Sequence, residues 1–260
     1  MTPKTKILAK AVADVRAFCK EHADAAQAAR YARFFTEGYD PYGITKEIWE
    51  ANDRRFYEQY RERFGLSDFL DLGDVLFESG KYEEGSFAVT TLRPLRDQLT
   101  PEAFQRIGGW LENGVRNWAH SDIICSELLG PCLKRGVAGI SDMSSWRGSK
   151  AKWKRRAVPV AMLALLDGRV KTESLLEFVR PLMQDGERVV HQGVGWFLRE
   201  AWKKNPVPVE DFLMEWKDTA PRLIFQYATE KMSASGKARF RKAPAVKKSS
   251  ARSRGVGRQH

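Results

Sequence analysis

Cysteine is scarce in this 260-residue sequence, which has only Cys19, Cys125 and Cys132. So few cysteines fit a reducing compartment. Cys125 and Cys132 stand seven residues apart, which on a helix means one face, two turns removed, and is typical of a core rather than of a CxxC-type metal site. The four histidines form no H-x₃-H pair either. We therefore expect no metal and no other cofactor.

Long hydrophobic runs are also missing. No apolar stretch approaches the roughly 20 residues that are needed to cross a bilayer. The first ten residues, Met1 to Lys10, are too polar for a signal peptide. These absences exclude a membrane-spanning protein and predict a cytoplasmic one.

Acidic residues are absent from Gly236 to the end of the chain, a segment that carries nine Lys or Arg. The net charge of the whole chain is +11, so subtracting these nine leaves only +2 for the rest. We expect a folded domain over residues 1–235 and a disordered basic tail over residues 236–260. Such a tail either adds nonspecific affinity for phosphate backbones or only improves solubility.

Helical periodicity runs through the remainder, and no segment alternates like a strand. Thr45, Ser67 and Thr100 (followed by Pro101) are typical N-terminal caps. The sequence thus predicts an all-α protein. Its other predicted helices cover Lys4–Glu21, Ala25–Thr36, 45–65, Ser121–Arg135, Ser149–Leu166, Glu173–Gln184, Glu187–Lys204 and Val209–Thr219.

Four prominent residues, each near a predicted helix start, are separated by 36, 38 and 40 positions in turn. They are Tyr82, Trp118, Arg156 and Trp196. A period near 40 is typical of HEAT-type helical pairs, which stack into a solenoid with inner helices along a concave face. An irregular helical domain is the alternative.

Trp118 and Asp122 belong to the segment Asn117–Asp122, and their four-residue spacing places them on one helical face, one turn apart. One interpretation is an aromatic wall beside a carboxylate. The other is a core tryptophan with an aspartate that complements the helix dipole.

A basic segment without acids follows, with Arg147, Lys150, Lys152, Lys154, Arg155 and Arg156. Cations oppose the dipole at a helix N-terminus, so three in a row before an apolar helix indicate an anionic partner such as a DNA phosphate. A solvated face without a ligand is the alternative.

Gly193 and Gly195 lie in the predicted helix that carries Trp196. Each costs about 1 kcal/mol relative to alanine in a helix. We expect the close approach of another backbone, or of a ligand, to offset that cost.

Together these segments resemble the AlkD-like DNA alkylation repair glycosylases over most of residues 5–230. The matching pieces are Asn117–Asp122, Trp153–Ala157 and Gly195–Pro206, with weaker agreement around Tyr31 and in the turn Tyr42–Ile44. The resemblance is carried by all of the pieces in order, at the right separations.

The resemblance implies a right-handed α-α superhelix of HEAT-like pairs whose concave face binds damaged double-stranded DNA. It implies hydrolytic release of cationic alkylpurines such as 3-methyladenine and 7-methylguanine. By position, Asp122 matches the catalytic aspartate, and Trp118 and Trp196 match the two active-site tryptophans. Arg156 matches a phosphate-contacting arginine, and with it we expect Arg155, Lys154, Lys152 and Tyr31 to bind DNA.

Two departures from the family pattern are the basic tail and the pair Gln192–Gly193, where a Lys-Ala pair is expected. The second departure removes one expected contact with the DNA backbone. We expect a monomer. The alternatives are a non-catalytic relative that binds branched or distorted DNA, and a HEAT-like protein-interaction scaffold with an apolar or acidic concave surface.

Overall fold

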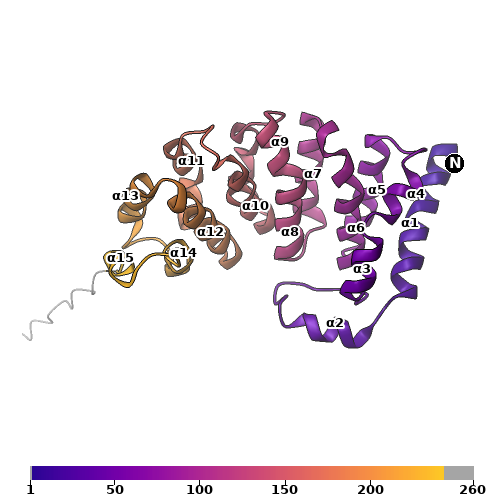
Figure 1. Ribbon diagram of the computed structural model, residues 1–260, viewed down its shortest axis with the longest axis horizontal. Helices are drawn as coiled ribbons and strands as arrows, with labels where there is room; N and C mark the ends of the chain where they lie inside the picture. The colour runs from indigo at the N-terminus through magenta and orange to yellow at the C-terminus, as the bar shows by residue number, and fades with distance from the viewer. Residues whose placement is uncertain (1, 243–260) are drawn as a thin grey trace, which may run out of the picture.

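The computed structural model describes residues 2–242, and within this range all regular structure is helical, without a strand (Figure 1). The predicted all-α class is confirmed for this part of the chain. The α-helices are α1 (Pro3–Glu21), α2 (Ala25–Ala32), α3 (Lys46–Asn52), α4 (Arg55–Tyr60), α5 (Leu66–Glu78), α6 (Tyr82–Leu92), α7 (Pro101–Asn113), α8 (Trp118–Ile124), α9 (Gly130–Arg135), α10 (Lys152–Met162), α11 (Thr172–Val179), α12 (Arg188–Lys204), α13 (Pro206–Trp216), α14 (Arg222–Ala228) and α15 (Ala234–Arg239).

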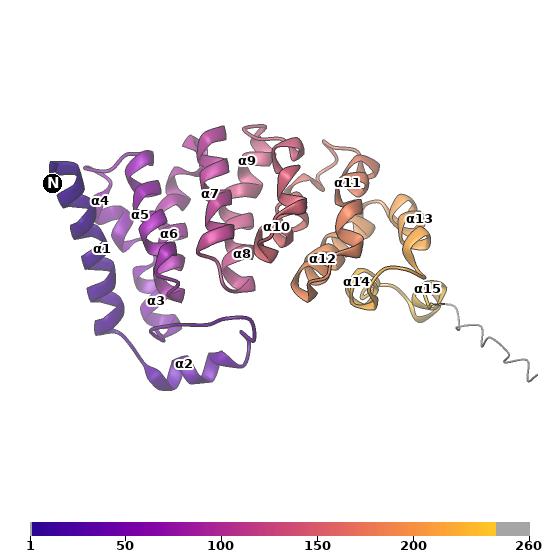
Figure 2. The ribbon, with the colours of Figure 1, turned by 180° about the vertical axis from the view of Figure 1, so that it is seen from behind.

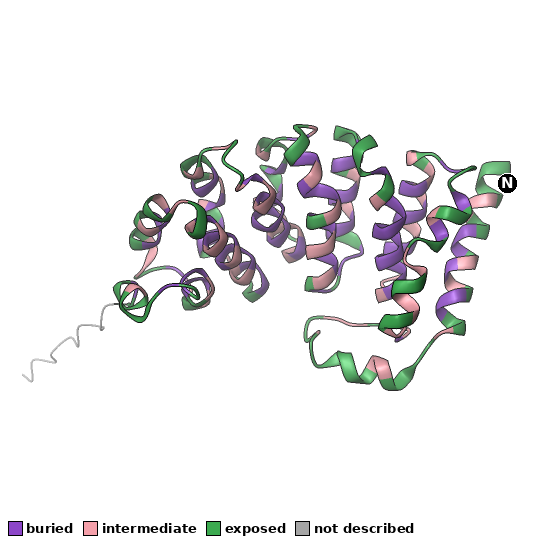
Figure 3. Cartoon of the chain, viewed as in Figure 1, coloured by how far each residue is buried: buried purple, intermediate pink, exposed green. Residues whose placement is uncertain are grey.

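The helices stand next to one another in a long row that follows the chain, from α1 at one end to α13, α14 and α15 at the other (Figures 1 and 2). Contacts link α6 to α8, α8 to α10, α10 to α12 and α12 to α14. These five helices form one layer, which we call the even-numbered layer. The pairs α5–α7 and α11–α13 make contacts on the other side. Buried faces run continuously along the middle of the row (Figure 3).

The four periodic positions of the sequence all lie in the even-numbered layer. Tyr82 and Trp118 are the first residues of α6 and α8, as predicted. Arg156 lies one turn inside α10, and Trp196 lies in the middle of α12. The period thus identified one layer of the fold, but the prediction that Trp196 lies near the start of a helix is wrong.

Of the two helix caps predicted in the N-terminal third, Thr45 is confirmed and Ser67 is wrong. Thr45 caps α3 through its hydroxyl, 3.5 Å from the backbone nitrogen of Ile48. Ser67 is not a cap, because α5 starts from Gly65, whose N–H donates to the Asp68 carboxylate at 3.0 Å. The segment 45–65, predicted as one helix, is divided into α3 and α4.

Later predicted helices shift or end in tighter or wider turns. Thr100 caps α7, as predicted, with Pro101 in its first turn. The helix predicted from Ser121 begins three residues earlier as α8, passes through a π-helical turn (Cys125–Leu129) and continues as α9. Both α10 and α11 end in 3₁₀ turns rather than continuing to the predicted ends.

The helices α14 and α15 were not predicted. α15 and the buried Phe240 extend ordered structure beyond the domain boundary expected at residue 235. The rest of the predicted tail, residues 243–260, lies outside the described residues. None of the helices in residues 2–242 combines the length and apolar character that a bilayer crossing requires.

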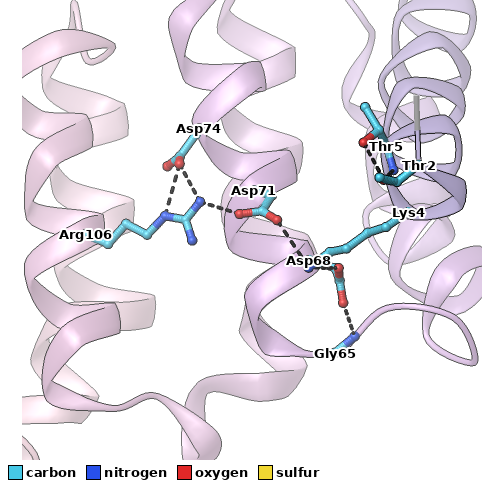
Figure 4. Close-up of polar contacts among 8 residues, drawn as sticks. All are labelled: Thr2, Lys4, Thr5, Gly65, Asp68, Asp71, Asp74 and Arg106. Carbon is cyan, nitrogen blue, oxygen red and sulfur yellow. Dashed lines mark hydrogen bonds and ion pairs between the residues drawn. The ribbon is translucent and has the colours of Figure 1, made fainter.

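An ion-pair chain joins α1, α5 and α7 (Figure 4). Asp68, Asp71 and Asp74 recur every three residues along α5, so they line one side of the helix. Lys4 contacts Asp68 at 2.8 Å, and Arg106 contacts Asp71 at 2.6 Å and Asp74 at 2.5 Å. Exposed pairs of this kind contribute at most about 1 kcal/mol each, so they align the helices more than they hold them together.

One segment leaves the row. Residues 24–44, which we call the arm, include α2 and the loop after it, and they hang to one side between α1 and α3 (Figures 1 and 2). α2 has no buried residue, and it ends at Ala32 rather than at the predicted Thr36. The tip of the arm returns to the row at α8 and α10, through contacts that are described below.

Candidate active site

A cleft of about 360 Å³ opens on the even-numbered layer, across four consecutive helices of that layer. Its lining comprises Trp118 and Asp122 from α8, Arg156 from α10, Gln192, Trp196 and Arg199 from α12, and Tyr227 from α14. The structure therefore brings the aspartate and both tryptophans singled out in the sequence into one cavity, although Trp196 is 74 residues from Asp122.

The start of α8 places Trp118 and Asp122 on one face. Asn117, which is buried, caps the helix by accepting the backbone N–H of His120 at 3.0 Å. The helix then begins with Trp118, and Asp122 follows one turn later. The spacing argument from the sequence thus predicted this local geometry correctly.

Asp122 forms a bidentate ion pair with Arg156. The Arg156 Nε and Nη2 groups donate to the two carboxylate oxygens at 2.9 and 2.8 Å, and Nη1 donates to the backbone oxygen of Val189 at 2.7 Å. The Arg156 side chain is only 6% exposed and that of Asp122 16%. Both groups are therefore rigidly held, because two parallel N–H···O hydrogen bonds join the edge of the guanidinium to the edge of the carboxylate.

The electrostatics of Asp122 reflect two opposed effects. Burial raises the pKa of its carboxyl above the ordinary value, and the Arg156 guanidinium opposes that rise. Because both oxygens accept from the guanidinium, the group is a carboxylate in this arrangement. Each oxygen keeps a second lone pair, so the carboxylate can still accept a proton or a hydrogen bond from the cleft.

Trp118 is unusually exposed for its size, at 41%. Its indole N–H donates to the backbone oxygen of Phe34 at 3.0 Å, and its ring stacks on Phe35 with centroids 5.5 Å apart. Both contacts come from the arm. One face of Trp118 is therefore covered by protein while the side chain also lines the cleft.

The two glycines of α12 permit close helix packing, as predicted. A Cβ atom at Gly195 would lie 2.5 Å from the Tyr227 Cβ and 2.8 Å from the backbone oxygen of Ile224, so α14 fits against α12 only because this position lacks a side chain. A Cβ at Gly193 would lie 3.2 Å from the Arg156 Cγ. Both glycines thus bring the walls of the cleft together.

Three residues of the cleft wall were not predicted as site residues. The Gln192 amide donates to the Tyr227 hydroxyl at 3.1 Å. Arg199 contacts Glu200 at 2.9 Å and Glu230 at 2.5 Å. Tyr227 had no signal in the sequence because its helix, α14, was not predicted, whereas Arg199 lies one turn after Trp196 and the helical period could have pointed to it.

The basic segment is largely neutralised by acids of the protein itself. Arg155 holds Asp185 through Nε at 2.6 Å and Nη2 at 3.2 Å. Lys154, 12% exposed, pairs with Glu112 at 3.0 Å. The remaining pairs are Lys152–Glu37 and Arg156–Asp122. Four of the six cations of this segment thus form ion pairs, with acids that lie far away in the sequence.

Tyr31 lies outside the cleft, in a second cavity of about 390 Å³ between the arm and the row. That cavity is largely aromatic and shares Trp118 with the cleft. Cys125 and Cys132 are both buried, in agreement with a core spacing. Within residues 2–242 no group of three or more His, Cys, Asp or Glu side chains is placed to hold a metal ion.

Comparison with known proteins agrees with the resemblance seen in the sequence. A solved structure, described as a predicted DNA alkylation repair enzyme from Enterococcus faecalis, superimposes with a TM-score of 0.70 at 14% identity, over 82% of this chain and 98% of that one. At that identity the likeness shows a shared fold. No curated protein matches the chain. The model of the family described as DNA alkylation repair enzyme matches residues 15–232. The chain therefore belongs to the DNA alkylation repair enzyme family.

Proposed function

We propose that this protein is a monofunctional DNA glycosylase that hydrolyses the N-glycosidic bond of cationic alkylated purines, of the 3-methyladenine and 7-methylguanine type, in duplex DNA. The observation that carries the proposal is the cleft in which one carboxylate, Asp122, lies with two indole rings, Trp118 and Trp196, from separate helices. The protein would act as a monomer without a cofactor.

The proposal includes the form of the DNA-binding surface. The two-sided helical row would be a right-handed superhelix of HEAT-like pairs, with the even-numbered helices as its inner, concave layer. This is supported by the position of the cleft, which lies entirely on those helices. DNA would lie along that layer, with the damaged nucleotide at the cleft.

The chemistry that remains for the protein is small. A purine alkylated on a ring nitrogen is already cationic. When the bond between C1′ and the base nitrogen breaks, its electron pair goes to the base, which therefore leaves as a neutral molecule. Positive charge then develops on the sugar, and Asp122 stabilises it electrostatically. A water oxygen bonds to C1′, and its proton passes to a free lone pair of the Asp122 carboxylate. No general acid is required for the departing base.

The tryptophans favour charged lesions over normal nucleotides. Cations are attracted to aromatic faces by about 0.5–2 kcal/mol each. Trp118 is substantially exposed and Trp196 half-buried, so both offer indole surface to a substrate in the cleft. Normal, neutral purines would gain less from the same two rings.

Phosphate contacts would come first from Arg156, and then from Lys152 once it leaves Glu37. Arg156 uses three of its five N–H groups within the protein and keeps one on each terminal nitrogen. Lys152 is 31% exposed. Arg155 and Lys154 would have to leave their acidic partners to reach a phosphate, and Tyr31 would approach DNA from the arm.

The experiment is single-turnover release of 7-methylguanine from methylated duplex DNA. Asp122→Asn should slow release by about 10²–10³-fold or more, because it removes the charge that faces the sugar. Asp185→Asn is the matched control, since it neutralises the other aspartate that pairs with an arginine of α10, and it should retain release. DNA affinity, measured in parallel, should persist in both variants.

Unchanged release by Asp122→Asn would refute the catalytic role of this carboxylate. A wild-type protein that binds DNA without releasing a base would favour the alternative, a non-catalytic protein for branched or distorted DNA.

A further inference from the structure

The tip of the arm fixes the position of Trp118. The Phe34 carbonyl accepts the indole N–H at 3.0 Å. Phe35 is stacked between Tyr39, 4.3 Å away with a 13° tilt, and Trp118, 5.5 Å away with a 14° tilt. A hydrogen bond at the edge of the ring and a stack on its face together define one orientation of the indole.

The arm is fastened to the row at its base by a buried carboxylate. Glu83, on α6, is 4% exposed. One of its oxygens accepts the backbone N–H of Tyr42 at 2.8 Å, and the other accepts those of Gly43 at 2.8 Å and Ile44 at 3.2 Å. The Glu83 carboxylate thus accepts from three consecutive backbone N–H groups of one turn, so a buried charge holds that turn.

The turn that Glu83 holds is shaped for this contact. Gly43 has a φ of +88°, which side-chain-bearing residues rarely adopt. A Cβ there would lie 2.1 Å from the backbone oxygen of Asp24, so the two ends of the arm meet at this glycine. Asp24 also donates its N–H to the Tyr42 carbonyl at 3.0 Å. The arm is thus a closed loop with a fixed base.

Three further contacts tie the far side of the arm to the row. The Asp40 carboxylate pairs with Lys81 at 2.6 Å, and the Asp40 backbone carbonyl accepts the N–H of Tyr82 at 3.0 Å. Glu37 pairs with Lys152 of α10. Because α2 has no buried residue, the arm keeps its place through these polar contacts together with the stacking of Phe35 on Trp118.

From this geometry we infer that the arm is a positioning element for the reaction, in which Phe35 holds the indole of Trp118 against the cleft and Glu83 fastens the arm that carries Phe35. The inference rests on the proposed function. An exposed tryptophan without the arm would sample several rotamers, and a site that is misplaced by about 1 Å loses up to about 10²-fold in rate.

The first readout is independent of catalysis. The protein is labelled with 5-fluorotryptophan, and the ¹⁹F resonance of Trp118 is assigned as the one lost in Trp118→Phe. Phe35→Ala should shift and broaden that resonance, because it removes the stacked ring. Phe34→Ala is the matched control: Phe34 contributes its backbone carbonyl to the indole, and its side chain is 51% exposed, so the resonance should stay in place.

The second readout is the single-turnover rate of base release from methylated duplex DNA. Phe35→Ala should lower the rate constant by roughly ten- to a hundredfold while DNA affinity changes less than threefold, because the cations and the carboxylate are intact. Phe35→Tyr keeps a flat ring and should restore most of the rate. Glu83→Gln should give the same pair of effects as Phe35→Ala, because its amide NH₂ would face backbone donors.

The outcomes separate this inference from the proposed function. If wild-type protein releases no base, both are overturned. If Asp122→Asn abolishes release but Phe35→Ala leaves either the resonance or the rate unchanged, only the positioning role is overturned. If Glu83→Gln unfolds the protein, Phe35→Ala and Phe35→Tyr still decide the question.

Discussion

Two adjacent arginines of α10 make ion pairs that look alike. Arg155 holds Asp185 through two N–H groups, and Arg156 holds Asp122 in the same bidentate way. In both pairs the acid comes from another part of the row, 30 and 34 residues away. All four side chains are at most 16% exposed. The pairing alone therefore does not tell which one belongs to a reactive site.

The surroundings of the two acids differ. Asp185 also accepts the backbone N–H of Glu187 at 2.8 Å, just before α12, so it joins the start of that helix to α10. Asp122 receives side-chain hydrogen bonds only from Arg156 among the described residues, and it lines the cleft. A carboxylate with spare lone pairs toward a cavity can meet a substrate, whereas one that completes a helix joint cannot without breaking it.

The two ion pairs should differ most in the loss of stability when the arginine is removed. Arg156→Met should lower the free energy of unfolding by about 3–5 kcal/mol, because Asp122 would stay buried without a counter-charge. Arg155→Met should lower the free energy of unfolding by less, because Asp185 still accepts the hydrogen bond from the Glu187 N–H. Urea denaturation of both variants measures the difference.

Double variants then separate structure from chemistry. Adding Asp122→Leu to Arg156→Met should recover most of the lost stability, since an apolar pair needs no charge compensation, but it should release no base. Arg155→Met with Asp185→Leu should recover stability and keep base release. Equal loss of base release in the two double variants would remove the distinction between the pairs.

His120 lies on α8 between Trp118 and Asp122, so it is a neighbour of one of the two ion pairs in the sequence. Burial lowers the pKa of His120 to about 4, opposed by its hydrogen bond of 2.8 Å to the Tyr82 carbonyl. The folded protein thus keeps it neutral, while the unfolded chain takes up a proton below pH about 6.5. Its contribution is fully present above that pH and is lost as the pH falls toward 4. The loss approaches about 3 kcal/mol.

The check is the free energy of unfolding across pH 4 to 8 for wild type and His120→Gln, whose difference isolates this residue. The pH dependence of stability that Asp122 contributes has the opposite sign. Because the pKa of Asp122 is raised in the folded protein, its contribution to stability is lost as the pH rises through that pKa. Asp122→Asn should therefore leave the acid-side loss in place. A wild-type curve that is parallel to that of His120→Gln would contradict the buried neutral histidine.

Features that depend on residues close together in the sequence could be predicted, and much of the candidate site consists of such features. The four-residue spacing of Trp118 and Asp122, the glycine pair in α12 and the period near 40 each depend on one helix or on a repeat of helices. All three led to the correct layer and to one cavity.

What could not be predicted depends on contacts across the fold. Lys152 and Glu37 are 115 residues apart, and Arg155 and Asp185 are 30 apart, so no window of sequence shows that these cations are already paired. The arm is a further case. Glu83 gave no signal, because a glutamate in a first helical turn is ordinary, and its role is visible only where the turn of the arm meets it.

The smallest predicted effect tests how much of the basic segment is available to DNA. Glu37→Gln removes the partner of the partly exposed Lys152, so we expect two- to fivefold tighter binding of duplex DNA and a salt dependence that is steeper by about 0.9, for one added phosphate contact. Glu112→Gln is the control, because it changes the net charge equally but frees only Lys154, which is 12% exposed and lies over the Trp146 ring. Affinity measured from 50 to 200 mM salt distinguishes a local contact from a general change in charge. If the two variants tighten binding equally, with parallel salt slopes, Lys152 contributes only its long-range charge.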